Sequence, residues 1–141
     1  MSKLRVLFIC TANSARSQMA EGLLRHLAGD RFEVFSAGTR PSQVNPNAVL
    51  AMEEIGIDIS SHDSKLADGF AGQSFDFVIT VCDSARESCP FFPGGRVRLH
   101  HSFEDPAAAP AEEQMQRFRV VRDQIRRWLD VEFIPTASRG T

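Results

Sequence analysis

The chain of 141 residues is long enough to form one domain with a buried core. Its 43% hydrophobic and 24% charged residues are ordinary for a soluble globular protein, and the net charge of −2 excludes a strongly basic surface for nucleic acid or anionic membranes. The first apolar run, residues 4–9, is too short for the core of a signal peptide or for a membrane span. We therefore expect a cytoplasmic protein, a monomer by default, with no nucleic-acid or membrane partner.

Apolar runs typical of strands alternate along the chain with the spacing typical of amphipathic helices. Strands are predicted at 4–9, 32–36, 75–81 and 97–100, and helices at 17–27, 46–55, 64–72 and in a long C-terminal stretch with an apolar stripe from Met115 to Trp128. The predicted fold is α/β: a single domain over residues 1–133 with a four-stranded parallel sheet and helices on both faces. Residues 134–141 show no pattern and are expected to form a loose tail.

The three cysteines are Cys10, Cys82 and Cys89. An odd number without an export signal disfavours a structural disulfide framework, and no C-x-x-C pair supports a zinc site, so we expect no cofactor. Cys10 and Cys82 each follow a predicted strand, at the edge where open parallel sheets bind ligands. This shared position points to a function for both thiols.

The segment CTANSARS, residues 10–17, joins the first predicted strand to the first helix. Such a turn points backbone N–H groups into one concavity, and the helix N-terminus adds positive potential. Arg16 adds a planar fork for two oxygens of a tetrahedral oxyanion, Ser17 can donate to the Cys10 sulfur, and Asn13 tolerates a left-handed backbone.

We therefore predict an oxyanion-binding loop in which Cys10 is a nucleophile of depressed pKa. The predicted loop residues are Thr11, Ala12, Asn13, Ser14, Ala15, Arg16 and Ser17. The alternative is a core cysteine and a surface arginine that share this spacing by chance.

The stretch VLFICTANSARSQMAEGLLR, residues 6–25, resembles the phosphate-binding loop of the low-molecular-weight protein tyrosine phosphatase fold, and more narrowly that of the arsenate reductases built on this fold. The likeness continues through SAGT (36–39), VNPNAVLAMEEIGIDIS (44–60), VITVCDSARESCP (78–90) and FEDPA (103–107). It covers nearly the whole chain up to the last helix, and it implies a flavodoxin-like strand order.

The resemblance also implies a reaction cycle. Cys10 would attack arsenate while Asp105 protonates the oxygen that leaves. Cys82 would then attack the Cys10 sulfur and release arsenite, Cys89 would attack Cys82 to free Cys10, and thioredoxin would reduce the Cys82–Cys89 disulfide. If residues 82–89 were helical, about 10 Å of rise would separate the two cysteines, beyond the roughly 7 Å limit for bonded Cα atoms, so the segment would have to unwind.

Simpler interpretations of these residues remain open. Asp105 before Pro106 is also typical of a turn, and Cys82 and Cys89 could be small buried hydrophobic residues. The chain would then be a low-molecular-weight phosphatase acting on phosphate monoesters. The absence of tyrosine and the small residues that follow Phe103 favour a small inorganic oxyanion instead, with weak phosphatase activity retained. A redox or oxyanion sensor that signals through Cys82 and Cys89 is a further alternative.

Some of these reductases bind potassium beside the loop, and the matching positions here are Asn13, Glu21 and Ser36. Asp63 occupies the position where a fourth ligand, a threonine, is expected. We therefore expect no required metal.

Overall fold

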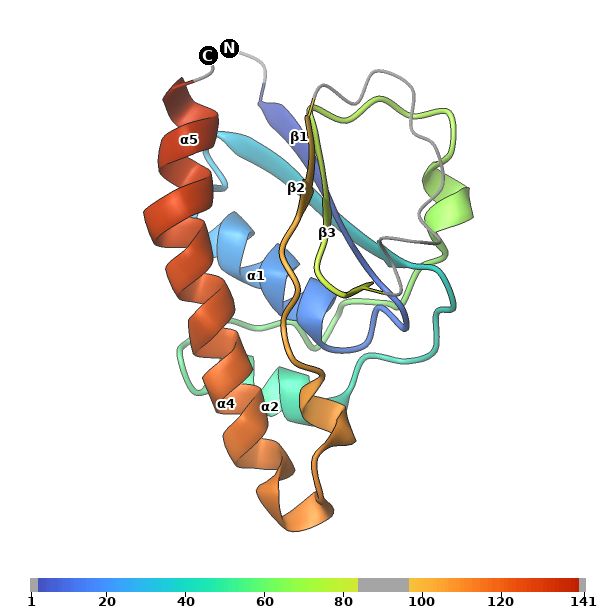
Figure 1. Ribbon diagram of the computed structural model, residues 1–141, viewed down its shortest axis with the longest axis vertical. Helices are drawn as coiled ribbons and strands as arrows, with labels where there is room; N and C mark the ends of the chain where they lie inside the picture. The colour runs from blue at the N-terminus through green and yellow to red at the C-terminus, as the bar shows by residue number, and fades with distance from the viewer. Residues whose placement is uncertain (1–2, 84–96, 140–141) are drawn as a thin grey trace.

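A parallel sheet organises the molecule (Figure 1). The computed structural model describes residues 3–83 and 97–139. Its strands are β1 (Leu4–Cys10), β2 (Phe32–Gly38), β3 (Phe77–Thr80) and β4 (Val97–His100). They lie in the order β2-β1-β3-β4, and every neighbouring pair is parallel. The predicted four-stranded parallel α/β sheet is confirmed.

The central position of β1 explains its continuous apolar sequence. Residues 6–9 are fully buried, as a parallel strand covered on both faces requires. Cys10 pairs in register with Gly38 at the end of β2, and the Val81 N–H after β3 donates to the Ile9 carbonyl at 2.9 Å. The carboxyl ends of three strands therefore meet at one edge of the sheet.

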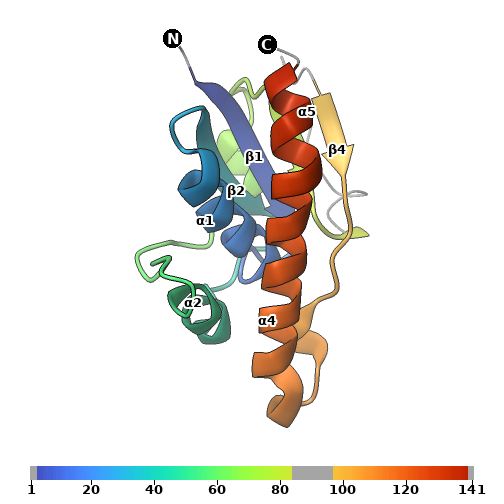
Figure 2. The ribbon, with the colours of Figure 1, turned by 90° about the vertical axis from the view of Figure 1, so that its left-hand side faces the viewer.

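Among the described residues, helices pack on one face of this sheet and the 3-10 turn η1 (Ala67–Phe70) packs on the other. The helical elements are α1 (Arg16–Ala28), α2 (Pro46–Glu53), the 3-10 turns η1 (Ala67–Phe70) and η2 (Pro106–Ala108), α4 (Ala111–Trp128), the π turn η3 (Leu129–Phe133) and α5 (Ile134–Arg139). In Figure 2, α1 and α4 lie side by side in front of the strands, and α2 packs against both.

Aromatic contacts show which face each element covers. Phe133, in η3, packs against Phe32 of β2, with ring centroids 5.6 Å apart. Phe35 of the same strand contacts Phe70 of η1 at 5.9 Å. Because residues three apart on a strand point to opposite faces, the α4 side and the η1 side of the sheet are both covered.

The helix predicted at 64–72 is wrong, because only the single 3-10 turn η1 forms there. The backbone before this turn is engaged elsewhere: the Gly38 N–H donates to the Lys65 carbonyl at 2.7 Å, and the Lys65 N–H donates to Asn13 Oδ1 at 2.9 Å. These bonds to distant residues hold the chain extended, and Leu66 forms an isolated parallel bridge with Gly38.

The C-terminal segment also differs from the expected loose tail. Residues 134–139 form α5, which continues α4 through η3. The Ile134 N–H donates to the Leu129 carbonyl five residues back, and this wider turn directly precedes Pro135, which has no N–H to donate. Ala137 is buried, so the helix is held against the core. In the described part of the chain, no helix is both long and apolar enough to cross a membrane.

Candidate active site

The segment after β1 forms a tight loop around the Cys10 sulfur. The Asn13 N–H donates to Cys10 Sγ at 3.2 Å, and Ser17 Oγ lies 2.8 Å from the same sulfur. Asn13 has a φ of 49°, the left-handed conformation expected of it. Ala15, which precedes α1, provides no side-chain cap, so side chains do not compete for the first N–H groups of the helix. The loop can therefore offer backbone donors to an oxyanion.

Gly38 allows this loop to lie close against the end of β2. A Cβ atom at this position would be 2.5 Å from the Thr11 carbonyl oxygen and 2.9 Å from the Asn13 nitrogen, both closer than real Cβ contacts. The Arg40 N–H also donates to the Thr11 carbonyl at 2.8 Å. The glycine of the SAGT motif thus has a steric role beneath the nucleophile.

The thiol of Cys10 is buried, and burial raises its pKa above the ordinary value. Hydrogen bonding to Ser17 and the positive charge of Arg16 both lower this pKa, but they only partly offset the burial. The prediction of a depressed pKa is therefore wrong for this structure. Ser17 and Arg16 are the groups that favour the thiolate, as expected, and desolvation outweighs them.

A buried hydrogen-bonded network supports the loop from below. Asn13 Nδ2 donates to Ser17 Oγ at 2.7 Å and to Ser36 Oγ at 3.0 Å, and Ser36 Oγ donates to Glu21 Oε1 at 2.5 Å. We call these four residues (Asn13, Ser17, Glu21 and Ser36) the underside of the loop. All four are buried, so the network is shielded from water.

The residues considered for potassium are gathered in the underside, but basic side chains already neutralise its carboxylate. Arg25 Nη2 lies 2.5 Å from Glu21 Oε2, and Lys65 Nζ lies 3.9 Å from Glu21 Oε1. The Asp63 carbonyl accepts from Lys65 Nζ at 2.7 Å. Because two cationic groups are directed at this carboxylate, the donor set does not fit a resident metal ion. Within residues 3–83 and 97–139, no cluster of three acidic, histidine or cysteine residues could hold a metal.

The open side of the loop carries Arg16 and Asp105. Arg16 Nη1 donates to the Phe103 carbonyl at 3.1 Å, and Arg16 Nη2 lies 4.0 Å from Asp105 Oδ2. Asp105 Oδ1 accepts from the Ala107 N–H at 3.0 Å and so caps η2, which fits the turn interpretation as well as the catalytic one. The structure thus brings together the predicted oxyanion fork and the predicted acid from segments 89 residues apart in the chain.

Cys82 lies beside the loop at the end of β3. It is buried and forms no disulfide, and its Sγ is 3.3 Å from Thr11 Oγ1. We call Arg16, Asp105 and Cys82 the rim of the loop. Cys89, the fifth predicted catalytic residue, lies outside the described residues.

Two residues of the site were not predicted from the sequence. Gln18 Nε2 donates to the Asn13 carbonyl at 3.1 Å and to Asn13 Oδ1 at 3.0 Å. Its Oε1 lies 2.9 Å from Nδ1 of His62, a half-buried residue whose pKa is lowered mainly by burial. These contacts join residues 44 apart, and no local pattern signals them. The ion pair of Glu21 with Arg25 could have been found, because the two residues have the i,i+4 spacing of neighbours on one helix face.

The comparisons with known proteins agree on one family. A family model described as low molecular weight phosphotyrosine protein phosphatase matches residues 5–131. An arsenate reductase of Halalkalibacterium halodurans is 48% identical over 127 residues, which cover 89% of this chain and 91% of the relative. A solved structure of an arsenate reductase in the phosphate binding state has a TM-score of 0.79 and 34% identity, covering 90% of this chain and 94% of that chain. A thioredoxin-dependent arsenate reductase of Corynebacterium glutamicum has a TM-score of 0.65 and 30% identity, covering 93% of this chain and 63% of that chain.

Proposed function

The chain belongs to the low molecular weight phosphotyrosine protein phosphatase family, and we propose that it is an arsenate reductase that takes electrons from thioredoxin. One observation carries this proposal: a second free thiol, Cys82, contacts the loop that holds the buried thiol of Cys10. Phosphate ester hydrolysis needs a single cysteine nucleophile, whereas reduction needs a second thiol within reach. The 48% identical arsenate reductase supports the same choice.

In the first step, the Cys10 thiolate attacks the arsenic atom of bound arsenate. The guanidinium of Arg16 and the N–H groups of the loop hold the arsenate oxygens and stabilise the charge that develops on them. Asp105 gives a proton to the departing oxygen, which leaves as water. The product is an As(V) adduct covalently bound to Cys10 Sγ.

In the second step, Cys82 Sγ attacks the Cys10 sulfur. A Cys10–Cys82 disulfide forms, the S–As bond breaks, and its electron pair stays on arsenic, which is reduced from As(V) to As(III) and leaves as arsenite. The 3.3 Å contact between Thr11 and Cys82 supports this step, because it brings the second thiol beside the residue that follows the nucleophile.

In the third step, the Cys89 thiolate attacks Cys82 and releases the Cys10 thiolate. The dithiol of thioredoxin then reduces the Cys82–Cys89 disulfide and is itself oxidised, which completes the two-electron balance. The assignment of Cys89 depends on its place in the sequence after Cys82. The choice of thioredoxin is supported by the thioredoxin-dependent enzyme of Corynebacterium glutamicum, whose chain is 30% identical.

A second activity, slow hydrolysis of small phosphate monoesters, is favoured by the contact of Arg16 with Asp105. A nucleophile, an oxyanion fork and an acid are sufficient for phosphoryl transfer to Cys10, and water can then release phosphate. Since the oxyanion-binding loop recognises a tetrahedral oxyanion by its shape and charge, phosphate and arsenate are both expected to bind there.

The proposal is tested by following NADPH oxidation with arsenate, thioredoxin and thioredoxin reductase, for the parent protein and for Cys82→Ser and Cys89→Ser. The parent is expected to turn over continuously. Cys89→Ser is expected to release one equivalent of arsenite and stop with Cys10 bonded to Cys82, and Cys82→Ser is expected to release none. Hydrolysis of p-nitrophenyl phosphate by Cys89→Ser serves as the control for an intact loop.

Failure of the parent to oxidise NADPH with arsenate, while p-nitrophenyl phosphate is still hydrolysed, would identify a phosphatase. Undiminished turnover by Cys89→Ser would remove Cys89 from the cycle and indicate another thiol donor.

A further inference from the structure

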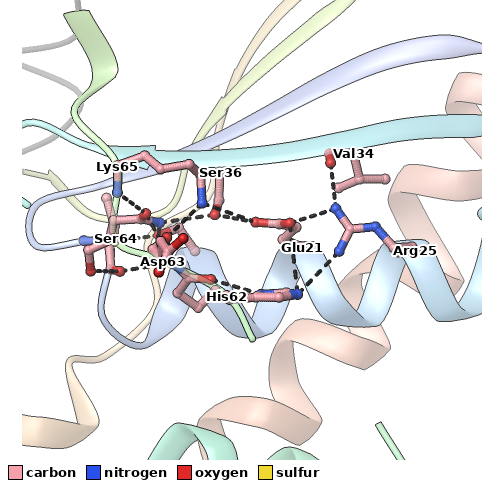
Figure 3. Close-up of polar contacts among 12 residues, drawn as sticks. Glu21, Arg25, Val34, Ser36, His62, Asp63, Ser64 and Lys65 are labelled. Carbon is pink, nitrogen blue, oxygen red and sulfur yellow. Dashed lines mark hydrogen bonds and ion pairs between the residues drawn. The ribbon is translucent and has the colours of Figure 1, made fainter. Parts of the chain in front are cut away.

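The carboxylate of Glu21 is the most buried acidic group beside the candidate active site. Its side chain is 8% exposed, and a charged group at this depth is costly unless it is paired and hydrogen-bonded. Ser36 donates to one oxygen at 2.5 Å, and Arg25 donates to the other at 2.5 Å. Both oxygens of this buried charge are therefore satisfied by the protein's own groups (Figure 3).

The hydrogen bonds between Glu21 and the nucleophile have only one possible sense. The Lys65 backbone N–H can only donate, and it donates to Asn13 Oδ1 at 2.9 Å, which fixes the orientation of the Asn13 amide. The Asn13 NH₂ group must then donate to Ser17 and Ser36. Because Ser17 Oγ accepts from Asn13, its own proton is left to donate to Cys10 Sγ, 2.8 Å away.

Arg25 binds Glu21, at the end of these hydrogen bonds that is farthest from Cys10. Its Nη2 also donates to the Val34 carbonyl at 2.7 Å, and its Nη1 lies 3.3 Å from His62 Nε2. Figure 3 shows the guanidinium directed at Glu21 from one side and the Lys65 side chain approaching from the other. The side chain of Arg25 is 47% exposed, so its place at the carboxylate is open to ions from solvent once the arginine is removed.

We infer that Arg25, assisted by Lys65, is the built-in cation of the Glu21 carboxylate, and that it positions the Asn13–Ser17 donors toward Cys10 without an alkali metal ion. Arg25 touches no reacting atom, so it is a positioning residue. An unpaired carboxylate would place uncompensated negative charge at the end of a hydrogen-bonded chain that leads to Cys10, and that charge disfavours the thiolate. This inference builds on the proposed role of Cys10 as the nucleophile, but it concerns only the acidity of the thiol.

The test measures the acidity of Cys10 in the absence of arsenate and thioredoxin, so its outcome is independent of the proposed reductase activity. In a Cys82→Ser, Cys89→Ser background, Cys10 is the only cysteine, and its rate of alkylation by iodoacetamide is followed against pH. The titration is run at equal ionic strength in potassium chloride and in tetramethylammonium chloride. Ser17 and Arg16, which lower the pKa of Cys10, are present in every sample, and Cys82, which raises it, is replaced by serine in every sample.

We expect the background protein to titrate identically in the two salts. Arg25→Ala is expected to raise the midpoint by about one pH unit in tetramethylammonium chloride, which lowers thiolate reactivity about tenfold at neutral pH, and potassium should restore part of the loss. Arg25→Lys should retain the midpoint of the background protein. The matched control is Arg119→Ala, which removes an exposed arginine of α4 that pairs with Glu54 and not with Glu21.

A midpoint of the background protein that depends on potassium would overturn the inference, and so would an Arg25→Ala protein that titrates as its parent does in both salts. If Arg25→Ala does not fold, Arg25→Gln keeps hydrogen-bonding groups without the charge. A raised midpoint in Arg25→Gln, but not in Arg25→Lys, would then support the built-in cation, and an unchanged midpoint in Arg25→Gln would refute it.

Discussion

The underside and the rim of the oxyanion loop are built in opposite ways. The underside is a closed network in which every residue is buried and the Asn13 amide is bonded on both its oxygen and its nitrogen. At the rim, the Asp105 side chain is 47% exposed and meets Arg16 only at 4.0 Å. The two regions share one loop but have very different densities of hydrogen bonds.

This difference separates two tasks. Donors fixed before the substrate arrives can stabilise charge on the thiol and the oxyanion without reorganising, and we propose this task for the underside. In the proposed cycle, the rim must admit an oxyanion, release a product and let one thiol reach another. Rim substitutions should therefore alter the chemistry and leave stability nearly unchanged, whereas underside substitutions should alter thiol acidity and stability.

Asp105→Asn is expected to have the largest effect on the chemistry. Loss of a general acid lowers kcat by about 10²–10⁴-fold. The asparagine oxygen can still accept from the Ala107 N–H, so η2 and the thermal stability should be retained. The measurement is kcat on aryl phosphates of decreasing leaving-group acidity, where the loss should grow as the leaving group becomes poorer. The neighbouring exposed carboxylate gives the control, Glu104→Gln, and equal losses in both variants would remove Asp105 from the role of acid.

Arg16→Lys tests the second residue of the rim. Lysine keeps the charge but loses the fork that can hold two oxygens, and removal of one preorganised donor typically lowers kcat by about 10²–10³-fold. Because the proposed arsenate reduction and phosphate ester hydrolysis use the same oxyanion-binding loop, the rates of both should fall by the same factor. A loss confined to the arsenate reaction would show that Arg16 does not bind the oxyanion in both reactions.

Ser17→Ala tests a residue of the underside. Burial already raises the pKa of Cys10, and hydrogen bonding to Ser17 lowers it, so the substitution should raise this pKa further. A hydrogen bond to a charged group contributes about 1.5–3 kcal/mol, which corresponds to roughly one to two pKa units and a similar number of powers of ten in thiolate at neutral pH. The rate at which iodoacetamide alkylates Cys10 in Ser17→Ala should therefore rise with pH toward the rate of the parent protein. The two rates should become equal once Cys10 is ionised in both proteins. A constant deficit at all pH values would mean that Ser17 acts otherwise than on thiol acidity.

The sheet edge and the two cysteines that lie at it could be predicted because local patterns determine them. A continuous apolar run identifies β1 as a central strand, and the residue that follows such a strand lies at the carboxyl edge. Cys10 ends β1 and Cys82 comes after β3, so both lie at this edge. The expectation that Asp105 is an acid beside Arg16 depended on the resemblance to the phosphatase fold, because Asp-Pro alone is also typical of a turn.

The underside and the acidity of the thiol could not be predicted, because both depend on distant contacts. Lys65 and Asn13 are 52 residues apart. The hydrogen bond between them holds the backbone extended where a helix was predicted over residues 64–72. The pKa of Cys10 was expected to be low because loop dipoles and Arg16 are visible in the sequence. The burial that outweighs them is produced by the packing of the whole sheet.

Gly38→Ala should have the smallest effect, and it tests whether the underside limits stability as well as acidity. The added methyl group would meet the Thr11 carbonyl oxygen at 2.5 Å, and a backbone atom within a hydrogen-bonded loop cannot simply rotate away. Overpacking of this kind usually costs about 1–3 kcal/mol in the free energy of unfolding, measured here by urea denaturation. Gly69→Ala is the matched control, because its Cβ would meet nothing within 4 Å. If the two variants are equally stable, the loop and the end of β2 are not as closely packed as the Gly38 contacts require, and the separation between a fixed underside and an adaptable rim fails at this point.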